Sequence, residues 1–262
     1  MLIDTHCHIH DSEFYPENRE QAYRESREAD VVMLCVGTNV ASSKEAIEFC
    51  RTHEGCYPVV GIHPHDTVSE NVAQIQMLLE EYREVVVGIG EIGLDYYYDH
   101  SPREVQQRAL REQLKLAVKH GLPVSFHVRD TAKQQEGVSV WSDFWPILDE
   151  FPEVKGVLHS FTDTEENLQK ALDRGLYIGI NGISTFTKET WQQQLFKEVA
   201  LENIVLETDA PFLTPKPFRG KMNIPAYVGR VAEHQAVLKN VSPTDVIRIT
   251  TTNARVVFGI NE

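Results

Sequence analysis

Residues 2–8 read Leu-Ile-Asp-Thr-His-Cys-His, a short apolar run that ends in a His-x-His pair. In an extended strand, alternate side chains lie on one face, so His6 and His8 face the same way and Cys7 faces the opposite way. Two imidazoles on one face at the end of a strand make half of a metal site. The rest of the chain decides which fold holds this pair and which other ligands join it.

Short runs rich in β-branched or other apolar residues recur, and their starts lie about 22–38 residues apart. That interval holds one strand, one helix and two loops, and runs without strict alternation are typical of strands buried on both faces. The runs are 2–5, 31–36, 57–61, 85–90, 123–127, 154–159, 176–180 and 203–208. They predict an α/β fold, a single-domain (β/α)8 TIM barrel over residues 1–262, with its site at the C-terminal mouth of the strands. A doubly wound sheet is the alternative, but no GxGxxG follows the first strand.

Two helices can be placed between and after these runs. Residues 103–120 carry an apolar stripe at helical spacing. Its positions are Leu110, Leu114, Ala117 and Val118. A second helix is predicted to begin after Ser242, an N-cap that precedes a first-turn proline, and to end at Gly259.

Composition and charge narrow the class of protein. The chain is 42% hydrophobic and 24% charged, as in a globular protein with a full core. No apolar stretch reaches the roughly 18–20 residues of a membrane span, and no signal peptide is evident, so we expect a cytoplasmic protein without a membrane partner. The cysteines, which form no CxxC pair, are expected to be reduced and mostly buried. They are Cys7, Cys35, Cys50 and Cys56.

The formal net charge of −14 bears on nucleic-acid binding. Proteins that neutralise many phosphates are usually basic, so we expect no extended nucleic-acid-binding surface. A hydrolase that takes one strand end remains compatible with this charge, because bound divalent cations change the local field. We expect the chain to act as a monomer.

Imidazoles and carboxylates fall at the C-terminal ends of several predicted strands, which converge at one mouth in a barrel. These candidate metal ligands are His6, His8, Glu91, His127, His159 and Asp209. Six ligands are too many for one tetrahedral ion, so we expect two divalent ions, with zinc, manganese, iron or nickel suited better than magnesium. Glu91 could bridge them, with His6, His8 and Asp209 on one ion and His127 and His159 on the other. Such a pair can activate a water and stabilise a leaving oxygen.

Any one of these histidines, taken alone, could equally be an ordinary core or surface residue. The other histidines serve as a comparison, because they lie in helical or loop contexts and are expected at the surface. They are His53, His100, His120 and His234, while His10 is left open.

Short motifs in a fixed order cover the chain from end to end. They are DTHCH (4–8), GIHPH (61–65), GEIGLDYY (90–97), HVRD (127–130), HSF (159–161), ETDAP (207–211), RGKMN (219–223) and TTNARVVF (251–258). In these motifs the chain resembles the TatD-like metal-dependent deoxyribonucleases of the amidohydrolase-type barrel group. The resemblance implies a barrel, the same ligands, and 3′–5′ exonuclease or related phosphodiesterase activity on DNA. Departures from the family pattern at His10, Thr162–Asp163, Ile224 and 130–141 bear on the choice of substrate.

Two candidate catalytic residues join Glu91 at the expected mouth. Asp209 can hold an ion and accept a proton from the attacking water, although an isolated Asp before Pro211 could also be a turn or N-cap carboxylate. His63 could donate a hydrogen bond to a phosphate oxygen or leaving group. His65 is more easily explained as structural.

Candidate substrate contacts lie in the same loops. Arg129 could pair with a phosphate through its planar fork, or form an ion pair with Asp130 or Glu136. Arg219 and Asn223 lie in the proline-rich segment 210–225 and could clamp a phosphodiester. Aromatic side chains at Tyr96, Tyr97 and Phe161 could stack on a base, or simply pack under a loop. The alternative activity is hydrolysis of a small ester, lactone, amide or phosphoester at the same metals, and a non-catalytic binding module is the third possibility.

Overall fold

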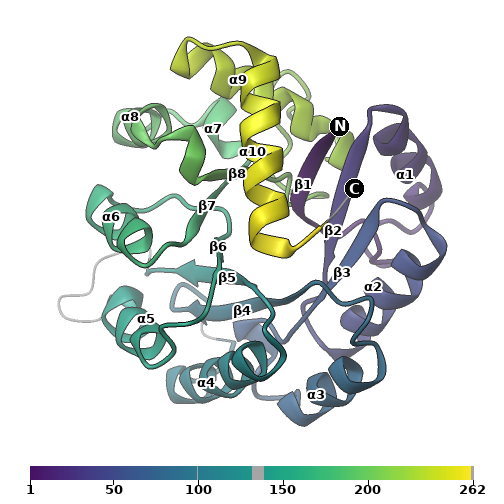
Figure 1. The fold of residues 1–262 in the computed structure, drawn as a ribbon, viewed down its shortest axis with the longest axis vertical. Helices are drawn as coiled ribbons and strands as arrows, with labels where there is room; N and C mark the ends of the chain where they lie inside the picture. The colour runs from purple at the N-terminus through teal and green to yellow at the C-terminus, as the bar shows by residue number, and fades with distance from the viewer. Residues whose placement is uncertain (99, 132–138, 261–262) are drawn as a thin grey trace.

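The computed structural model describes residues 1–98, 100–131 and 139–260. Its strands form one parallel sheet in which β1 to β8 neighbour one another in chain order, with the helices outside (Figure 1). The strands are β1 (Leu2–Cys7), β2 (Val31–Val36), β3 (Cys56–Val60), β4 (Gly88–Asp95), β5 (Val124–Arg129), β6 (Gly156–Leu158), β7 (Tyr177–Ile180) and β8 (Ile204–Leu206). The sheet closes where His8 donates to the carbonyl of Ala210 and Asp209 donates to that of His6. The predicted (β/α)8 barrel is confirmed.

The helices lie between the strands and after them. They are α1 (Arg19–Glu28), α2 (Val40–Thr52), α3 (Val72–Glu81), α4 (Arg103–His120), α5 (Val140–Asp149), α6 (Glu165–Asp173), α7 (Ile183–Phe186), α8 (Thr190–Glu198), α9 (Val228–Lys239) and α10 (Pro243–Phe258), with short 3-10 turns at Pro64–Asp66, Leu201–Asn203 and Pro225–Tyr227. None of the helices in the described ranges has the length and apolarity to cross a membrane.

Both predicted helices are confirmed. The stripe of α4 is buried except for Val118, which is 36% exposed. Helix α10 begins where Ser242 accepts a hydrogen bond from the amide of Asp245, and it ends at Gly259 in a left-handed conformation.

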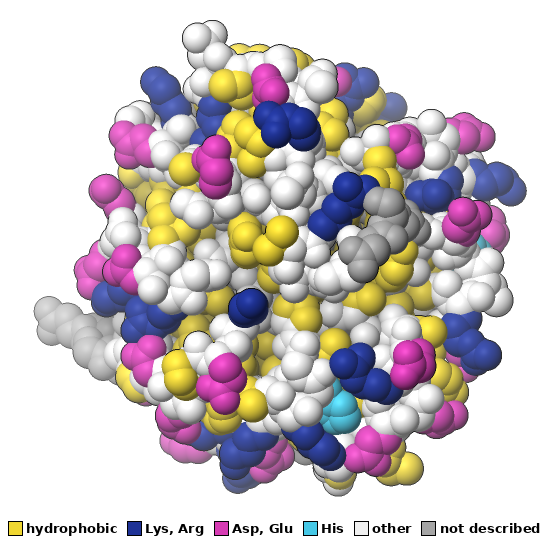
Figure 2. All heavy atoms as spheres, in the orientation of Figure 1, with side chains coloured by type: hydrophobic (Ala, Val, Ile, Leu, Met, Phe, Trp, Pro, Cys, Tyr) yellow, Lys and Arg dark blue, Asp and Glu magenta, His cyan; other side chains and the backbone are white. Residues whose placement is uncertain are grey.

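The C-terminal helix closes one end of the barrel. A cluster of buried apolar side chains joins Ala254, Val257 and Phe258 of α10 to β1, β2, β3, β6 and β8. A side chain added at Gly88, the first residue of β4, would lie 3.4 Å from the Phe258 ring, so α10 covers the N-terminal ends of the strands. Figure 1 shows α10 across this end, and Figure 2 shows the same face with basic and acidic side chains interspersed over it. The C-terminal mouth is therefore on the opposite side.

Several strand boundaries differ from the predicted runs. Strand β4 runs from Gly88 to Asp95, so Glu91 lies inside the strand and not after it. The apolar run is interrupted by this carboxylate, but the buried Ile92 and Leu94 follow it, and the backbone pairs with β5 up to Asp95–Arg129 after a register shift between Ile89 and Ile92. Gly93 allows the approach, because a Cβ there would lie 1.8 Å from the His127 carbonyl oxygen. Strand β8 is shorter than predicted and ends three residues before Asp209.

The cysteines are free thiols. Cys7, Cys35 and Cys56 are buried and Cys50 is partly buried, as expected. The Cys7 thiol donates to the Leu34 carbonyl, away from the two neighbouring histidines.

Candidate metal centre

The predicted ligands converge at the C-terminal mouth of the barrel. Nε2 of His6 lies 3.4 Å from Oε2 of Glu91, and Nε2 of His8 lies 3.4 Å from Oδ1 of Asp209. Nδ1 of His127 lies 2.8 Å from Oε1 of Glu91. Nε2 of His159 faces both carboxylates, at 3.8 Å from Asp209 and 4.0 Å from Glu91. The strand-end positions of these six residues thus place them in one cluster.

Glu91 stands between two groups of ligand atoms. Its Oε2 faces His6, while its Oε1 faces His127 and lies 3.7 Å from Nε2 of His63. Among the described residues, three sets of side chains bring ligand atoms within 4.8 Å of one another: His6, His8 and Asp209; His63, Glu91 and His127; and His6, His159 and Glu207. Glu91 lies between the first two sets. A carboxylate with one oxygen toward each of these two sets has the arrangement that a bridging ligand needs.

The imidazoles of His6, His8 and His127 are held by hydrogen bonds to their outer nitrogen, so the other nitrogen points inward. The outer nitrogen of His6 is bonded to the Ser125 hydroxyl, and that of His8 donates to the Val36 carbonyl at 2.8 Å. In proteins, hydrogen bonds of this kind fix the orientation and tautomer of metal-ligating histidines. The rings are thus set before any ion binds.

Two carboxylates that lie beside the outer nitrogens of ligand histidines were missing from the predicted site. Asp95 accepts from Nε2 of His127 at 2.9 Å and from Nε2 of His65 at 3.0 Å. Glu207 lies 3.0 Å from Nδ1 of His159. A signal existed in the sequence: Asp95 is four residues after Glu91 on the same strand, and Glu207 is two residues before Asp209.

Burial and unmet polar groups indicate that the cluster fits metal ions. Nε2 of His6 is fully buried and has no hydrogen-bond partner among the described residues. An unpaired buried ring nitrogen is costly unless a ligand satisfies it. The donor set of imidazole nitrogens and carboxylate oxygens is one that zinc, manganese and iron accept.

The charges of the cluster are strongly coupled. Burial lowers the pKa of both His127 and His159, but nearby carboxylates outweigh it. Asp95 and Glu91 raise the pKa of His127 to about 9, and Glu207 and Asp209 raise that of His159 to about 10. Protons therefore occupy these rings at neutral pH when no ion is bound, and a bound cation takes their place.

The carboxylates of the cluster stay ionised. Burial raises the pKa of Glu91 and Asp209, but the surrounding histidines outweigh it and hold both below the usual range. His63 behaves differently, because burial and the neighbouring His127 hold its pKa well below normal and keep it neutral. Its Nδ1 accepts from the His65 amide, so the ring proton lies on Nε2, which faces Glu91.

Asp209 lies on a tight turn that directs its carboxylate into the cluster. Its backbone has φ 56°, and its carbonyl accepts from the amide of Phe212. The side-chain amide of Asn223 donates to the carbonyls of Thr208 (3.0 Å) and Phe212 (2.6 Å), on either side of Asp209. Asp209 therefore combines both of its predicted positions: its backbone forms a turn, and its carboxylate faces His8 in the cluster.

The predicted substrate contacts divide into two groups. A cavity of about 670 Å³ at the mouth is lined by His63 and Arg129 together with the cluster. Arg129 makes no ion pair with Asp130; its guanidinium lies 4.3 Å from the Tyr97 ring centre, and Glu136 is outside the described residues. Phe161 is buried, 4% exposed, and borders a neighbouring cavity.

Tyr96, Arg219 and Asn223 are used within the protein instead. The Tyr96 ring is buried and its hydroxyl donates to Asp143. Arg219 donates to the Thr214 carbonyl and covers the Phe186 ring at 3.9 Å. Asn223 is fully buried, so its expected clamp on a phosphodiester is replaced by a clamp on the Asp209 turn.

The remaining histidines are outside the cluster. His10, left open by the sequence, is fully buried and bonded to the Ser42 hydroxyl. His100 is exposed, whereas His53, His120 and His234 are partly buried rather than fully at the surface.

Together, the barrel and the cluster define a metal-dependent hydrolase. A family model described as TatD related DNase matches residues 3–259, and the chain belongs to this family. It is 35% identical over 266 residues to the uncharacterized metal-dependent hydrolase YabD of Bacillus subtilis, covering 100% of both chains. It is 31% identical to the 3′-5′ ssDNA/RNA exonuclease TatD of Salmonella typhimurium, covering 99% of each. The structure of the TatD homologue YJJV from Escherichia coli superimposes with a TM-score of 0.88 at 26% identity, over 99% of this chain and 98% of the other.

Proposed function

We propose that this chain is a two-metal phosphodiesterase that removes nucleotides from the 3′ end of a nucleic-acid strand. The observation that carries the proposal is Glu91, whose two oxygens face two separate groups of ligand atoms. The name of the Salmonella relative and the family description support the substrate class.

Two ions at this cluster would be held by His6, His8, Glu91, His127, His159 and Asp209, with Glu91 between them. Bound divalent ions lower the pKa of water and polarise a phosphoryl oxygen. Asp209 is placed to accept the proton of the attacking water, because its carboxylate is ionised and faces the mouth cavity. His63 donates its Nε2 proton in a hydrogen bond to a phosphate oxygen, and Arg129 neutralises the adjoining phosphate.

The net charge of −14 keeps a second activity under consideration, which is hydrolysis of a small ester, lactone, amide or phosphoester at the same cluster. The monomeric state, the cytoplasmic location and the absence of an extended nucleic-acid-binding surface stay predictions.

The test is hydrolysis of 5′-labelled single-stranded DNA, duplex DNA and RNA with added magnesium, manganese or zinc, beside a panel of small esters, lactones and amides. We expect single strands to shorten from the 3′ end and Asp209→Asn to abolish this. The matched control is Asp149→Asn, an exposed carboxylate paired with Arg174. Turnover of the small substrates alone would support the second activity, and full activity of Asp209→Asn would overturn the mechanism.

A further inference from the structure

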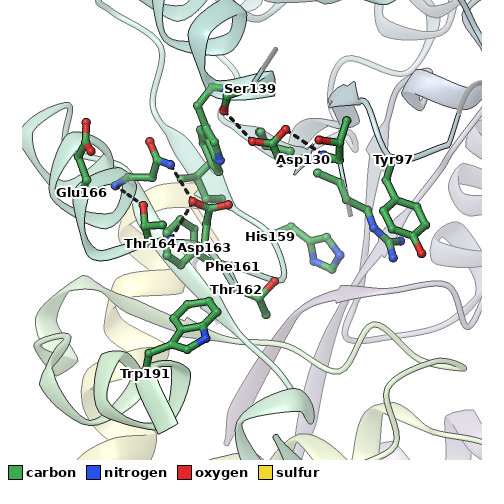
Figure 3. A pocket seen from close by; sticks show the side chains of 16 residues that line it. Tyr97, Asp130, Ser139, His159, Phe161, Thr162, Asp163, Thr164, Glu166 and Trp191 are labelled. Carbon is green, nitrogen blue, oxygen red and sulfur yellow. Dashed lines mark hydrogen bonds between the residues drawn. The ribbon is translucent and has the colours of Figure 1, made fainter. Parts of the chain in front are cut away.

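A second cavity adjoins the metal centre. It measures about 550 Å³ and shares Val128, Arg129, His159 and Thr162 with the mouth cavity. Its other walls come from the segments after β4, β5 and β6 and from α5, α6 and α8 (Figure 3). A group bound here would lie next to His159, and therefore next to the site of hydrolysis.

The wall of this side cavity carries exposed aromatic rings. Trp191 of α8 is 46% exposed and Tyr97 is 43% exposed, whereas Trp141 and Trp145 are 5% exposed each. Figure 3 shows Trp191 and Tyr97 on opposite sides of the cavity, with His159 between them in that view. An open indole face beside a cavity is a stacking surface for a planar ligand, and base–aromatic stacking tolerates any base.

The polar groups of the side cavity favour an uncharged ligand with hydrogen-bond donors. Asp163 accepts through Oδ1 from the amide of Thr164 and from the side chain of Asn167, both at 2.7 Å. Its Oδ2 receives no donor from the described residues, and Glu166 adds a second carboxylate to the wall. Such a wall repels phosphate, but it accepts a hydrogen bond from an amino group.

A cation stands where the two cavities meet. The guanidinium of Arg129 is stacked on Tyr97 and Tyr98, 4.3 and 4.9 Å from their ring centres. It forms no ion pair with a carboxylate among the described residues, and it lines both cavities. A phosphodiester would place its phosphate at this junction and the attached base in the side cavity.

We propose that the side cavity binds the nucleobase of the nucleotide adjoining the scissile phosphate, with Trp191 stacked on the base and Asp163 accepting from its amino group. This inference rests on the proposed nuclease function. It predicts a preference for adenine, cytosine and guanine over thymine and uracil, because the last two carry no exocyclic amino group.

The kinetic test compares oligonucleotides that carry a normal base or an abasic site at each position next to the cleaved bond. Trp191→Ala should raise the KM for normal substrates about 5- to 10-fold, in line with the loss of one exposed base–aromatic stacking contact. The KM for the substrate that is abasic at the bound position should stay unchanged. Trp191→Tyr retains an aromatic ring, so its KM for normal substrates should stay close to that of the parent. Met77→Ala, on the exposed side of α3, is the control. Equal KM for Trp191→Ala and the parent on every substrate would overturn the proposal.

Asp163→Asn tests the hydrogen bond separately. Its amide can retain the Oδ1 contacts and presents a donor in place of Oδ2, so the preference should shift toward thymine, which offers O4 as an acceptor. An unchanged base preference would contradict the assigned role of Asp163.

A binding test separates failure of this inference from failure of the proposed function. Trp191 is the exposed one of the chain's three tryptophans, so 2′-deoxyadenosine should quench its fluorescence in metal-free protein. Deoxyribose 5-phosphate should not quench this fluorescence. The Trp191→Phe variant gives the fluorescence of the other two tryptophans as the baseline. Fluorescence quenching without hydrolysis would contradict only the nuclease function. Hydrolysis with neither quenching nor an effect of Trp191→Ala on KM would contradict the base site.

Discussion

Replacing Asn223 by alanine tests whether the turn that carries Asp209 is held in place from outside the cluster. Asn223 is fully buried, and its side-chain amide donates to the carbonyls of Thr208 and Phe212. Alanine removes both donors and leaves two carbonyl oxygens beside a small void. The Asp209 turn then loses the contacts that hold both of its ends.

The stability cost follows from these two hydrogen bonds. A typical bond contributes about 1 kcal/mol net, and a buried acceptor left without a donor costs about 1–3 kcal/mol. We therefore expect Asn223→Ala to lower the free energy of unfolding by about 2–4 kcal/mol. For a chain of this length, about 2 °C of Tm accompanies each kcal/mol, so the Tm should fall by about 4–8 °C in a thermal melt.

The effect of Asn223→Ala on metal binding and activity should be larger than its effect on stability, and confined to the cluster. Loss of a hydrogen bond behind a metal ligand typically lowers metal affinity or activity about 10- to 100-fold. We expect a drop of this size in kcat/KM for whichever substrate proves active, together with lower metal content by elemental analysis.

The chain offers a matched control in Asn253 of α10. Its side-chain amide likewise donates to two buried carbonyls, Leu201 at 2.8 Å and Ile204 at 2.7 Å, but on the helix that closes the opposite end of the barrel. Asn253→Ala should show a comparable fall in Tm with normal metal content and activity per folded molecule. If the two variants lose activity equally, or if Asn223→Ala keeps full activity and metal content, the positioning argument is refuted.

Three further outcomes are expected. Glu91→Ala should lower metal content toward one ion or none by elemental analysis, since it removes the ligand between the two groups; retention of two ions would contradict the bridging assignment. Asp95→Asn should weaken metal binding about 10- to 100-fold in a competition assay with a chelating dye, because Nε2 of His127 loses its charged acceptor, and unchanged affinity would argue against this role. Removal of metal by a chelator should lower the Tm reversibly, by about 5–8 °C if the ion is present at 100–1,000 times its Kd, and an unmoved melt would count against ions at this buried cluster.

The fold could be predicted from the regular spacing of the apolar runs, because each run is long enough for one buried strand and each interval holds one helix. The boundaries could not. The run at 85–90 is apolar, but the strand begins at Gly88 and continues through Glu91 to Asp95. A single carboxylate inside an apolar run does not end a strand, because Ile92 and Leu94 beyond Glu91 are buried and their backbone stays paired with β5.

The convergence of the six candidate ligands was predictable for a related reason, since parallel strands in a closed barrel bring their C-terminal ends together whatever the details of packing. The surrounding residues depend on those details. Asn223 and Tyr96 have the chemistry of substrate contacts, but burial directs their polar atoms to Thr208 and Asp143 instead. Asp95 has the chemistry of a ligand, and only its distance to His127 assigns it a supporting position.

The division between strands and loops has a consequence for the evolution of this site. The inward-facing imidazoles of His6 and His8 are anchored by Ser125 of β5 and the Val36 carbonyl of β2, so these two strands help to orient ligands that they do not carry. A change in β5, which carries His127 and anchors His6, would therefore disturb two ligands. Trp191 and Asp163, by contrast, stand on α8 and on the segment after β6 and touch none of these anchors. Substitutions there can alter which base is accepted while the hydrolytic centre stays intact, which is the separation that the Trp191 and Asp163 variants measure.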